Sequence, residues 1–268
     1  MNRATPLIAA LLPLLFSAGA AAANENGHAA PSLASIGVLY DVDAPFGSRG
    51  RSLSVIRPEG SGYVYETYSK GLGLARLAIA SDALESTRFD LDNAGQVRAT
   101  EYLCRSCDFG NKGGLMNIAY DWTSGSALFT SGGEELEFAL EPRAMDRKAW
   151  EIQKMVALAA GMALGVEPTI EGGKLKLYSG ERMGEETLDT GAGEMQTVKY
   201  RRQREGSDNF QFIWYARELG WLPARWEIWR GDKRGEQRKD RRMIIIEAYE
   251  YHWGEDAALA MRQDWLGR

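Results

Sequence analysis

Cys104 and Cys107 are the only two cysteines in the chain, and their spacing is compatible with either a redox reaction or a short disulfide. In an oxidising compartment two thiols this close are expected to pair. A redox pair usually begins at the start of a helix, which lowers the pKa of the first thiol. The residues around this pair instead indicate a strand entering a turn. We therefore expect a structural disulfide, with redox function, free thiols or a metal site as the alternatives.

Histidine is too scarce to favour catalysis or metal binding. His28 and His252 are the only two histidines, so a zinc site would have to rely on carboxylates and the cysteine pair. A serine or cysteine nucleophile normally needs a positioned base, and His252 lies in a predicted strand, where a structural role is the simpler interpretation. We expect no metal, no cofactor and no catalytic residue.

Aromatic and basic residues gather in the second half of the chain. Residues 230–242 hold seven basic and three acidic side chains. This stretch is interpreted either as a solvated hairpin tip or as a surface that attracts anionic headgroups or an acidic partner. The net charge of −5 argues against nucleic acid as the partner. Six of the eight tryptophans lie in the second half of the chain: Trp214, Trp221, Trp226, Trp229, Trp253 and Trp265.

The first 23 residues have the pattern of a cleavable secretory signal. Arg3 precedes an apolar run from Pro6 to Phe16, and four alanines end at Ala23. The run is shorter than the ~20 apolar residues that a membrane span needs. We expect cleavage between Ala23 and Asn24, a periplasmic location and no transmembrane span in the mature chain.

Alternating patterns separated by glycine-containing turns predict a mainly antiparallel β fold with some helix. Residues 24–34 are expected to be a flexible segment, residues 35–253 a single β-rich domain, and residues 254–268 a tail compatible with a helix from Asp256 to Leu266. One strong helix is predicted from Asp146, as N-cap, to Leu164, with Gly165 as the stop. The expected architecture is a curved sheet or half-barrel packed on this central helix. Strands are predicted at Ile36–Val42, Arg51–Arg57, Tyr63–Tyr68, Gly73–Ala80, Ser86–Asp90, Val97–Leu103, Glu134–Leu140 (half-buried), Leu175–Ser179, Met195–Arg202, Phe210–Ala216, Pro223–Trp229 and Met243–Trp253.

Four short features resemble the bacterial envelope family catalogued as domain of unknown function 3108. They are the strand at residues 38–42, the mid-chain stretch 120–122, the helix that starts at Asp146, and the run 214–216 followed by 222–225. The resemblance implies an exported antiparallel β protein with a packed helix and no activity to carry over. The general shape is also similar to the half-barrels of periplasmic lipoprotein carriers, whose concave face holds acyl chains.

These patterns favour a non-catalytic binding module for a hydrophobic or lipid-like ligand or an envelope component. The alternative is a structural or assembly factor that acts by surface contact and has no ligand cavity. An enzyme would need a pocket of ionisable residues with perturbed pKa values, which the sequence does not predict. The candidate ligand-binding residues are Phe212, Trp214 and Trp226, with Arg225 and Arg230 near the rim.

Overall fold

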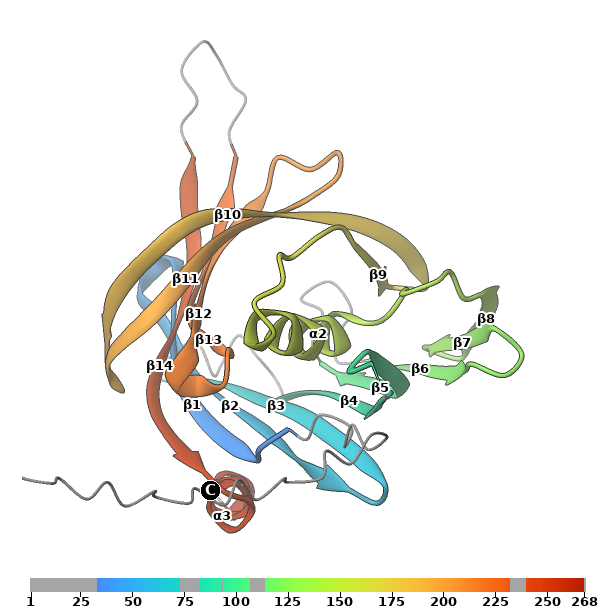
Figure 1. Cartoon of the computed structure of the whole chain (residues 1–268), viewed down its shortest axis with the longest axis horizontal. Helices are drawn as coiled ribbons and strands as arrows, with labels where there is room; N and C mark the ends of the chain where they lie inside the picture. Colours follow the sequence, from blue (N-terminus) through green and yellow to red (C-terminus); the bar gives the residue numbers. More distant parts are fainter. Residues whose placement is uncertain (1–32, 73–81, 93, 107–113, 232–239, 268) are drawn as a thin grey trace, which may run out of the picture.

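Fourteen antiparallel strands form one continuous, curved sheet in the described part of the chain (Figure 1). The computed structural model describes residues 33–72, 82–92, 94–106, 114–231 and 240–267. The strand order is β8-β7-β6-β5-β4-β3-β2-β1-β14-β13-β12-β11-β10-β9, so β1 pairs with β14 and joins the two halves of the chain. The prediction of a mainly antiparallel β fold is confirmed.

Most predicted strands are present, but β6, β7 and β9 were not predicted, and β10 is much longer than the predicted strand at Leu175–Ser179. The predicted strand at residues 73–80 lies outside the described residues. Two short 3-10 helices, η1 (Pro45–Gly47) and η2 (Arg217–Leu219), follow β1 and β12. The strand bounds are β1 Ile36–Ala44, β2 Ser48–Glu59, β3 Gly62–Leu72, β4 Ala83–Leu91, β5 Val97–Arg105, β6 Leu115–Asp121, β7 Ser126–Ser131, β8 Glu134–Ala139, β9 Glu167–Glu171, β10 Lys174–Thr190, β11 Gly193–Arg204, β12 Phe210–Ala216, β13 Pro223–Arg230 and β14 Arg241–Trp253.

Helix α2 (Arg147–Ala159) lies on the inner side of the curved sheet (Figure 1). Asp146 caps it as predicted, because its carboxylate accepts hydrogen bonds from the backbone N–H groups of Lys148 and Ala149 at 2.9 and 2.8 Å. The predicted helix end at Leu164 is wrong. Gly161 adopts a left-handed conformation, with φ of 69°, and ends the helix several residues earlier. Ten of the thirteen helical residues are buried, so the helix is enclosed around its circumference.

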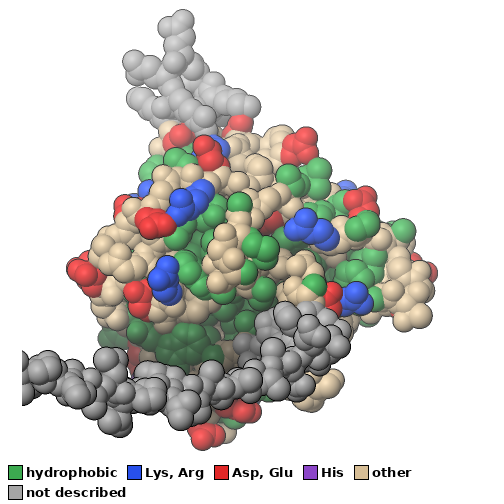
Figure 2. All heavy atoms as spheres, in the orientation of Figure 1, with side chains coloured by type: hydrophobic (Ala, Val, Ile, Leu, Met, Phe, Trp, Pro, Cys, Tyr) green, Lys and Arg blue, Asp and Glu red, His purple; other side chains and the backbone are tan. Residues whose placement is uncertain are grey.

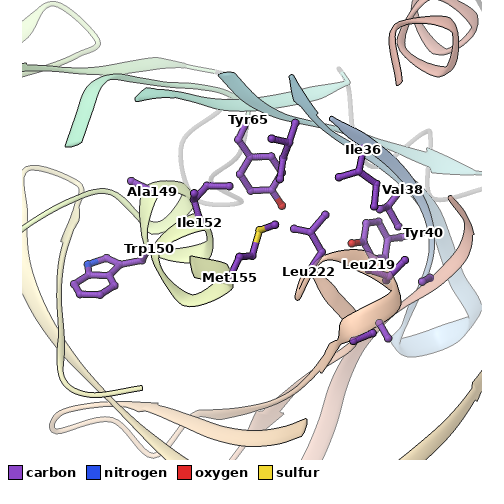
Figure 3. Close-up of a cluster of buried hydrophobic side chains, with 14 of the residues drawn as sticks. Ile36, Val38, Tyr40, Tyr65, Ala149, Trp150, Ile152, Met155, Leu219 and Leu222 are labelled. Carbon is purple, nitrogen blue, oxygen red and sulfur yellow. The ribbon is translucent and has the colours of Figure 1, made fainter. Parts of the chain in front are cut away.

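The largest hydrophobic cluster connects α2 to both halves of the sheet. Figure 3 shows Met155 of α2 pointing toward Tyr65 of β3 and Leu222, which follows η2. The same cluster includes Ile36 and Val38 of β1, which are fully buried. Because successive side chains of a strand point to opposite faces, this burial identifies the inner face of the sheet.

The two edges of the sheet, β7–β8 and β9–β10, approach each other near the start of α2. Met145 forms an isolated parallel bridge with Thr169 of β9. A Cβ atom on Gly173, in the turn between β9 and β10, would lie 3.0 Å from the ring of Phe129 on β7 and 3.3 Å from Leu136 on β8. The β9–β10 turn therefore packs against the β7–β8 hairpin.

Strand β8 is more exposed than its alternation predicts. Leu136 is 49% exposed, while Phe138 and Leu140 are partly buried against a small core. The prediction of a half-buried strand fails because β8 is the outer strand of the sheet, with β7 as its neighbour. An outer strand has fewer side chains to pack against.

The C-terminal helix α3 (Glu255–Gly267) packs against β1 and β2 on the side away from α2. Ala258 is fully buried, and the Met261 sulfur lies close to Gly37 of β1. The Arg262 guanidinium donates to the buried Glu66 of β3 at 2.8 Å and so links the helix to the sheet. Among the described residues, no helix is long and apolar enough to cross a membrane.

Candidate functional site

Strand β13 presents two chemically different faces. Trp226, Ile228 and Arg230 alternate along one face, and Glu227 and Trp229 lie on the other, where the Trp229 indole donates to Glu227 at 2.9 Å. Trp226 belongs to the same buried cluster as Leu158 of α2, so the first face is the inner one. The period-2 pattern of the sequence predicts this division correctly.

An apolar strip crosses the inner face of β1, β14 and β13. We define the apolar strip as Val42, Trp226, Ile228, Ile244 and Ile246. Trp226 pairs with Ile246, which pairs with Val42, and Ile228 pairs with Ile244. All five side chains are half-buried, which leaves part of each apolar surface in contact with solvent. In Figure 2 hydrophobic side chains gather in the middle of the molecule, with basic and acidic side chains around them.

The indole N–H of Trp226 is buried without a hydrogen-bond partner in the part of the chain that the structure describes. A buried donor of this kind usually finds an acceptor, and leaving it unsatisfied costs about 1–3 kcal/mol. The apolar strip therefore contains one buried polar group that the described residues leave unsatisfied.

Two arginines continue the same face beyond the apolar strip. Arg230 of β13 and Arg241 of β14 are direct cross-strand partners, after a bulge that shifts the register between Ile228 and Trp229. Both are exposed. We call these two residues the arginine pair.

A surface depression of about 250 Å³ lies where β1 ends and β14 continues past it. Arg241 lines it, so the depression adjoins the arginine pair, and Ile244 lines it from the apolar strip. The remaining lining residues are Asp43, Ala44, Pro45, Arg242, Met243 and Ile245.

Most of the candidate residues from the sequence lie on the opposite face of the sheet from the apolar strip. Phe212 pairs with Glu227, and Trp214 pairs with Arg225, whose guanidinium forms an ion pair with Glu247. The structure therefore separates Phe212, Trp214 and Arg225 from Trp226. Of the two arginines predicted near the rim, Arg225 lies on the opposite face and Arg230 lies at the end of the apolar strip.

Phe212 and Trp214 instead belong to a packed cluster of rings and cations. We define the ring cluster as Phe210, Phe212, Trp214 and Trp229, whose neighbouring rings lie 5.4–6.2 Å apart. Lys199 lies 4.4 Å from the centre of the Trp214 ring, and Arg201 lies 4.7 Å from that of Phe210. Cations over aromatic faces are favourable contacts.

Ionic groups around α2 are buried and mutually paired. Lys154 and Arg202 share the carboxylate of Glu167 at 3.2 and 2.9 Å, and each of the three residues is less than 10% exposed. Burial lowers the pKa of Lys154. A second buried pair joins Lys148 to Glu151 at 3.0 Å. The Lys154–Glu167–Arg202 group links α2 to β9 and β11, whereas the Lys148–Glu151 pair lies within α2. Both have the geometry of structural ion pairs.

The carboxyl group of the α2 N-cap, Asp146, has a raised pKa. Burial raises the pKa of Asp146 to about 6, although backbone and side-chain hydrogen bonds oppose the shift. Thr87 and Tyr120 donate to the same carboxylate oxygen, each at 3.1 Å. These contacts are those of a helix cap, so the raised pKa is a consequence of its enclosure.

The other residues singled out from the sequence belong to neither the apolar strip nor the ring cluster. Cys104 is fully buried, but Cys107 lies outside the described residues, so the disulfide stays a prediction. The cleavage position Ala23–Asn24 lies outside them as well. His252 is exposed beside Glu250 at 2.9 Å. Across the described ranges, no group of three or more histidine, cysteine or acidic residues could hold a metal ion.

Fold and site together define the class of a mostly antiparallel β protein built on one open, curved 14-stranded sheet. One solved structure with this architecture is a β-barrel-like protein of domain of unknown function DUF1849 from Brucella abortus. It has a TM-score of 0.52 and 8% identity, over 83% of this chain and 99% of that one. This similarity shows the fold alone. No family model and no curated protein sequence matches the chain.

Two further solved structures share less of the geometry. A putative exported protein with a YmcC-like fold from Bacteroides fragilis has a TM-score of 0.32 and 11% identity, over 83% of this chain and 97% of that one. A putative lipoprotein from Parabacteroides distasonis has a TM-score of 0.31 and 10% identity, with the same two coverages.

The resemblance to domain of unknown function 3108 is wrong. No family model matches, and the similar barrel-like structure carries the name of a different domain. The short segments behind that resemblance explain the error. Residues 38–42, 120–121 and 214–216 lie in β1, β6 and β12, where aromatic residues are common in any antiparallel sheet.

Proposed function

We propose that this protein is a non-catalytic binding module that holds a hydrophobic or lipid-like ligand on the apolar strip. The observation that carries the proposal is a row of half-buried apolar side chains on the inner face, beside a buried indole N–H without a partner. Apolar surface with one well-placed polar group is typical of small-molecule sites. In this proposal the sheet is a half-barrel around a central α2, and the apolar strip is the part of the interior left available.

The same proposal places the protein outside the cytoplasm. Its support is the signal-like pattern that ends at Ala23. N-terminal sequencing of protein recovered from the periplasm of an expressing bacterium is expected to begin at Asn24. Retention of residues 1–23 in that protein would contradict this part of the proposal.

A competing proposal is an assembly factor that acts by surface contact. The ring cluster favours it, because Phe212 and Trp229 are half-buried on the face opposite the apolar strip. Aromatic residues are common in protein interfaces. The two proposals place the contact surface on opposite faces of the same strands, so mutations separate them.

Binding of a neutral apolar fluorophore, N-phenyl-1-naphthylamine, tests the first proposal. We expect saturable binding by the purified protein and at least a tenfold weaker affinity in Ile244→Asp, because a charge would enter the apolar strip. The matched control is Leu128→Asp, which changes a 38% exposed leucine on β7. Both variants are first compared with the parent by circular dichroism and urea unfolding.

The outcomes of this test are clear. Loss of binding in Ile244→Asp with retention in Leu128→Asp supports the apolar strip. No saturable binding by the parent protein, or equal affinity in all three proteins, contradicts it. Loss of probe binding in Trp229→Ala with normal binding in Ile244→Asp would instead favour a contact surface at the ring cluster.

A further inference from the structure

The free edge of β8 carries an inference about a protein partner, and this inference goes beyond the proposed function. β8 is the last strand of the sheet order and pairs only with β7 (Figure 1). Across the described ranges, its six residues form no backbone hydrogen bond outside that ladder. A row of backbone N–H and C=O groups therefore points away from the sheet, and such a row is a template for another strand.

The opposite edge of the sheet, at β9, is partly occupied by the chain itself. The N–H of Ile170 donates to the carbonyl of Met145 at 2.9 Å, and the N–H of Met145 donates to the carbonyl of Pro168 at 3.3 Å. These bonds use backbone groups on the side of β9 that faces away from β10. The edge that stays open to a partner is therefore that of β8.

One face of β8 offers apolar surface to a neighbouring strand. Leu136 is 49% exposed, and Phe138 is half-buried on the same face. Leu136 also borders the β9–β10 turn, because a Cβ atom on Gly173 would lie 3.3 Å from its side chain. A strand added along β8 would cover this surface with every second side chain.

The other face of β8 is acidic. Glu135 and Glu137 lie on it, and both are exposed. Their cross-strand partners on β7 are Thr130 and Leu128, neither of which carries a charge. Within the part of the chain that the structure describes, the two carboxylates form no ion pair. This face therefore has negative charge that its own sheet does not neutralise.

The charge on this face determines which kind of strand fits the edge. Opposite charges at opposed positions of neighbouring strands attract, and like charges repel. A second copy of β8 would place its own glutamates beside Glu135 and Glu137, so pairing between two copies is disfavoured. A strand with basic side chains on that face would be attracted.

We infer that the edge of β8 binds an extended segment of a partner protein in which basic and apolar residues alternate. Backbone hydrogen bonds to β8 supply the pairing, and the alternating side chains supply specificity, as in strand addition generally. The apolar side chains pack beside Leu136 and Phe138, and the basic side chains lie beside Glu135 and Glu137. Part of the affinity is electrostatic and decreases as the salt concentration rises.

Fluorescence anisotropy with a labelled synthetic peptide tests the inference. The probe is a peptide of alternating lysine and valine that matches the six residues of β8 in length. One comparison peptide has glutamate in place of lysine. Another keeps the lysines but has proline in place of valine, which removes N–H donors that a ladder needs. We expect the lysine–valine peptide to bind at least about tenfold more tightly than either.

Reversing the charge of the edge should reverse the preference. In Glu135→Lys/Glu137→Lys we expect weak binding of the lysine–valine peptide and tighter binding of the glutamate–valine peptide. The control, Asp189→Lys/Glu194→Lys, makes the same change in net charge at two exposed acids on β10 and β11 and should keep the preference of the parent. Circular dichroism first establishes that all three proteins are folded alike.

Hydrogen exchange locates the peptide independently of charge. At saturating lysine–valine peptide, amide protons of β8 should become protected from exchange, and those of β9 should not change. Protection elsewhere without protection of β8 would overturn the inference.

Three other outcomes would also overturn it. Absence of peptide binding would mean that the glutamates only guard the edge against pairing. Equal affinity for the proline-containing peptide would mean that binding is charge attraction without strand addition. A dimer of the parent protein that Glu135→Lys/Glu137→Lys alters would mean that a second copy occupies the edge.

Discussion

At the scale of single residues, Asp146 combines two opposing effects on stability. Its carboxylate caps α2, which is favourable, and its enclosure disfavours the charged form and raises its pKa to about 6. A carboxyl group whose folded pKa is raised binds its proton more tightly in the folded state than in the unfolded chain. Its contribution is therefore fully present below the unfolded pKa and is lost as the pH rises through about 6.

We expect Asp146→Asn to keep the cap and to remove this pH dependence. Relative to the parent, the variant should gain free energy of unfolding between pH 4.5 and pH 8, whereas Asp146→Ala should lose about 1–2 kcal/mol at both pH values. Urea unfolding of the three proteins at these pH values measures the difference. A parallel pH response of Asp146→Asn and the parent would show that the carboxyl group does not titrate in this range.

Trp226 gives a second prediction at this scale. Trp226→Phe removes the unpartnered indole N–H, so the ligand-free variant should be as stable as the parent or more stable by up to about 1 kcal/mol. The control is Trp150→Phe, because the Trp150 indole donates to the Pro168 carbonyl at 2.9 Å. That variant should lose about 1 kcal/mol or more. A larger loss in Trp226→Phe than in Trp150→Phe would show that the Trp226 N–H has a partner.

At the scale of elements, α2 is held by ionic groups that the sequence does not reveal. An amphipathic pattern predicts one apolar side against the sheet and one side in water. The structure instead buries Lys148, Glu151 and Lys154 together with the apolar residues. Their partners on distant strands, such as Arg202, become visible only once the strand order is known.

Breaking the network at its shared carboxylate tests the role of these groups. Glu167→Gln leaves Lys154 and Arg202 buried without their common counter-charge, and we expect a loss of about 3–5 kcal/mol in unfolding free energy. Glu185→Gln is the control, because Glu185 forms an exposed pair with Arg182 and should change stability little. Equal effects of the two substitutions would mean that the buried network contributes nothing specific.

The sequence could predict strands and local alternation but not which strands lie together. The sequence pattern predicts β12 and β13 to within one residue of their bounds, and the spacing in β13 predicts its two faces. The pairings of Trp226 with Ile246 and of Arg230 with Arg241 depend on how β13 aligns with β14. Bulges shift the register of the β12–β13 and β13–β14 pairs, and no local sequence pattern specifies them. The sequence alone groups Phe212 and Trp214 with Trp226, because composition does not assign residues of different strands to faces of the sheet.

At the scale of the whole molecule, the two edges of the sheet come together where the β9–β10 turn packs on the β7–β8 hairpin. Gly172 and Gly173 are both left-handed, with φ of 57° and 68°, but only Gly173 approaches Phe129 and Leu136. Gly172→Ala should therefore lower the free energy of unfolding by about 1 kcal/mol through backbone strain. Gly173→Ala should cost more, since its Cβ also meets β7 and β8.

Thermal unfolding of the two alanine variants measures this difference. A melting temperature clearly lower for Gly173→Ala than for Gly172→Ala supports a closed arrangement in which the β9–β10 turn packs on the β7–β8 hairpin. Equal melting temperatures would indicate that this contact does not contribute to stability.

The central claim is that a ligand occupies the inner face beside Trp226. Nitrogen-15 NMR of the indole N–H groups tests it most directly, with the Trp226 and Trp229 resonances assigned from Trp226→Phe and Trp229→Phe. On saturation with N-phenyl-1-naphthylamine we expect the Trp226 resonance to shift. The Trp229 resonance should stay in place, because its N–H is bound to Glu227 on the opposite face. A shift of Trp229 alone, or of neither resonance at saturating probe, would contradict the claim.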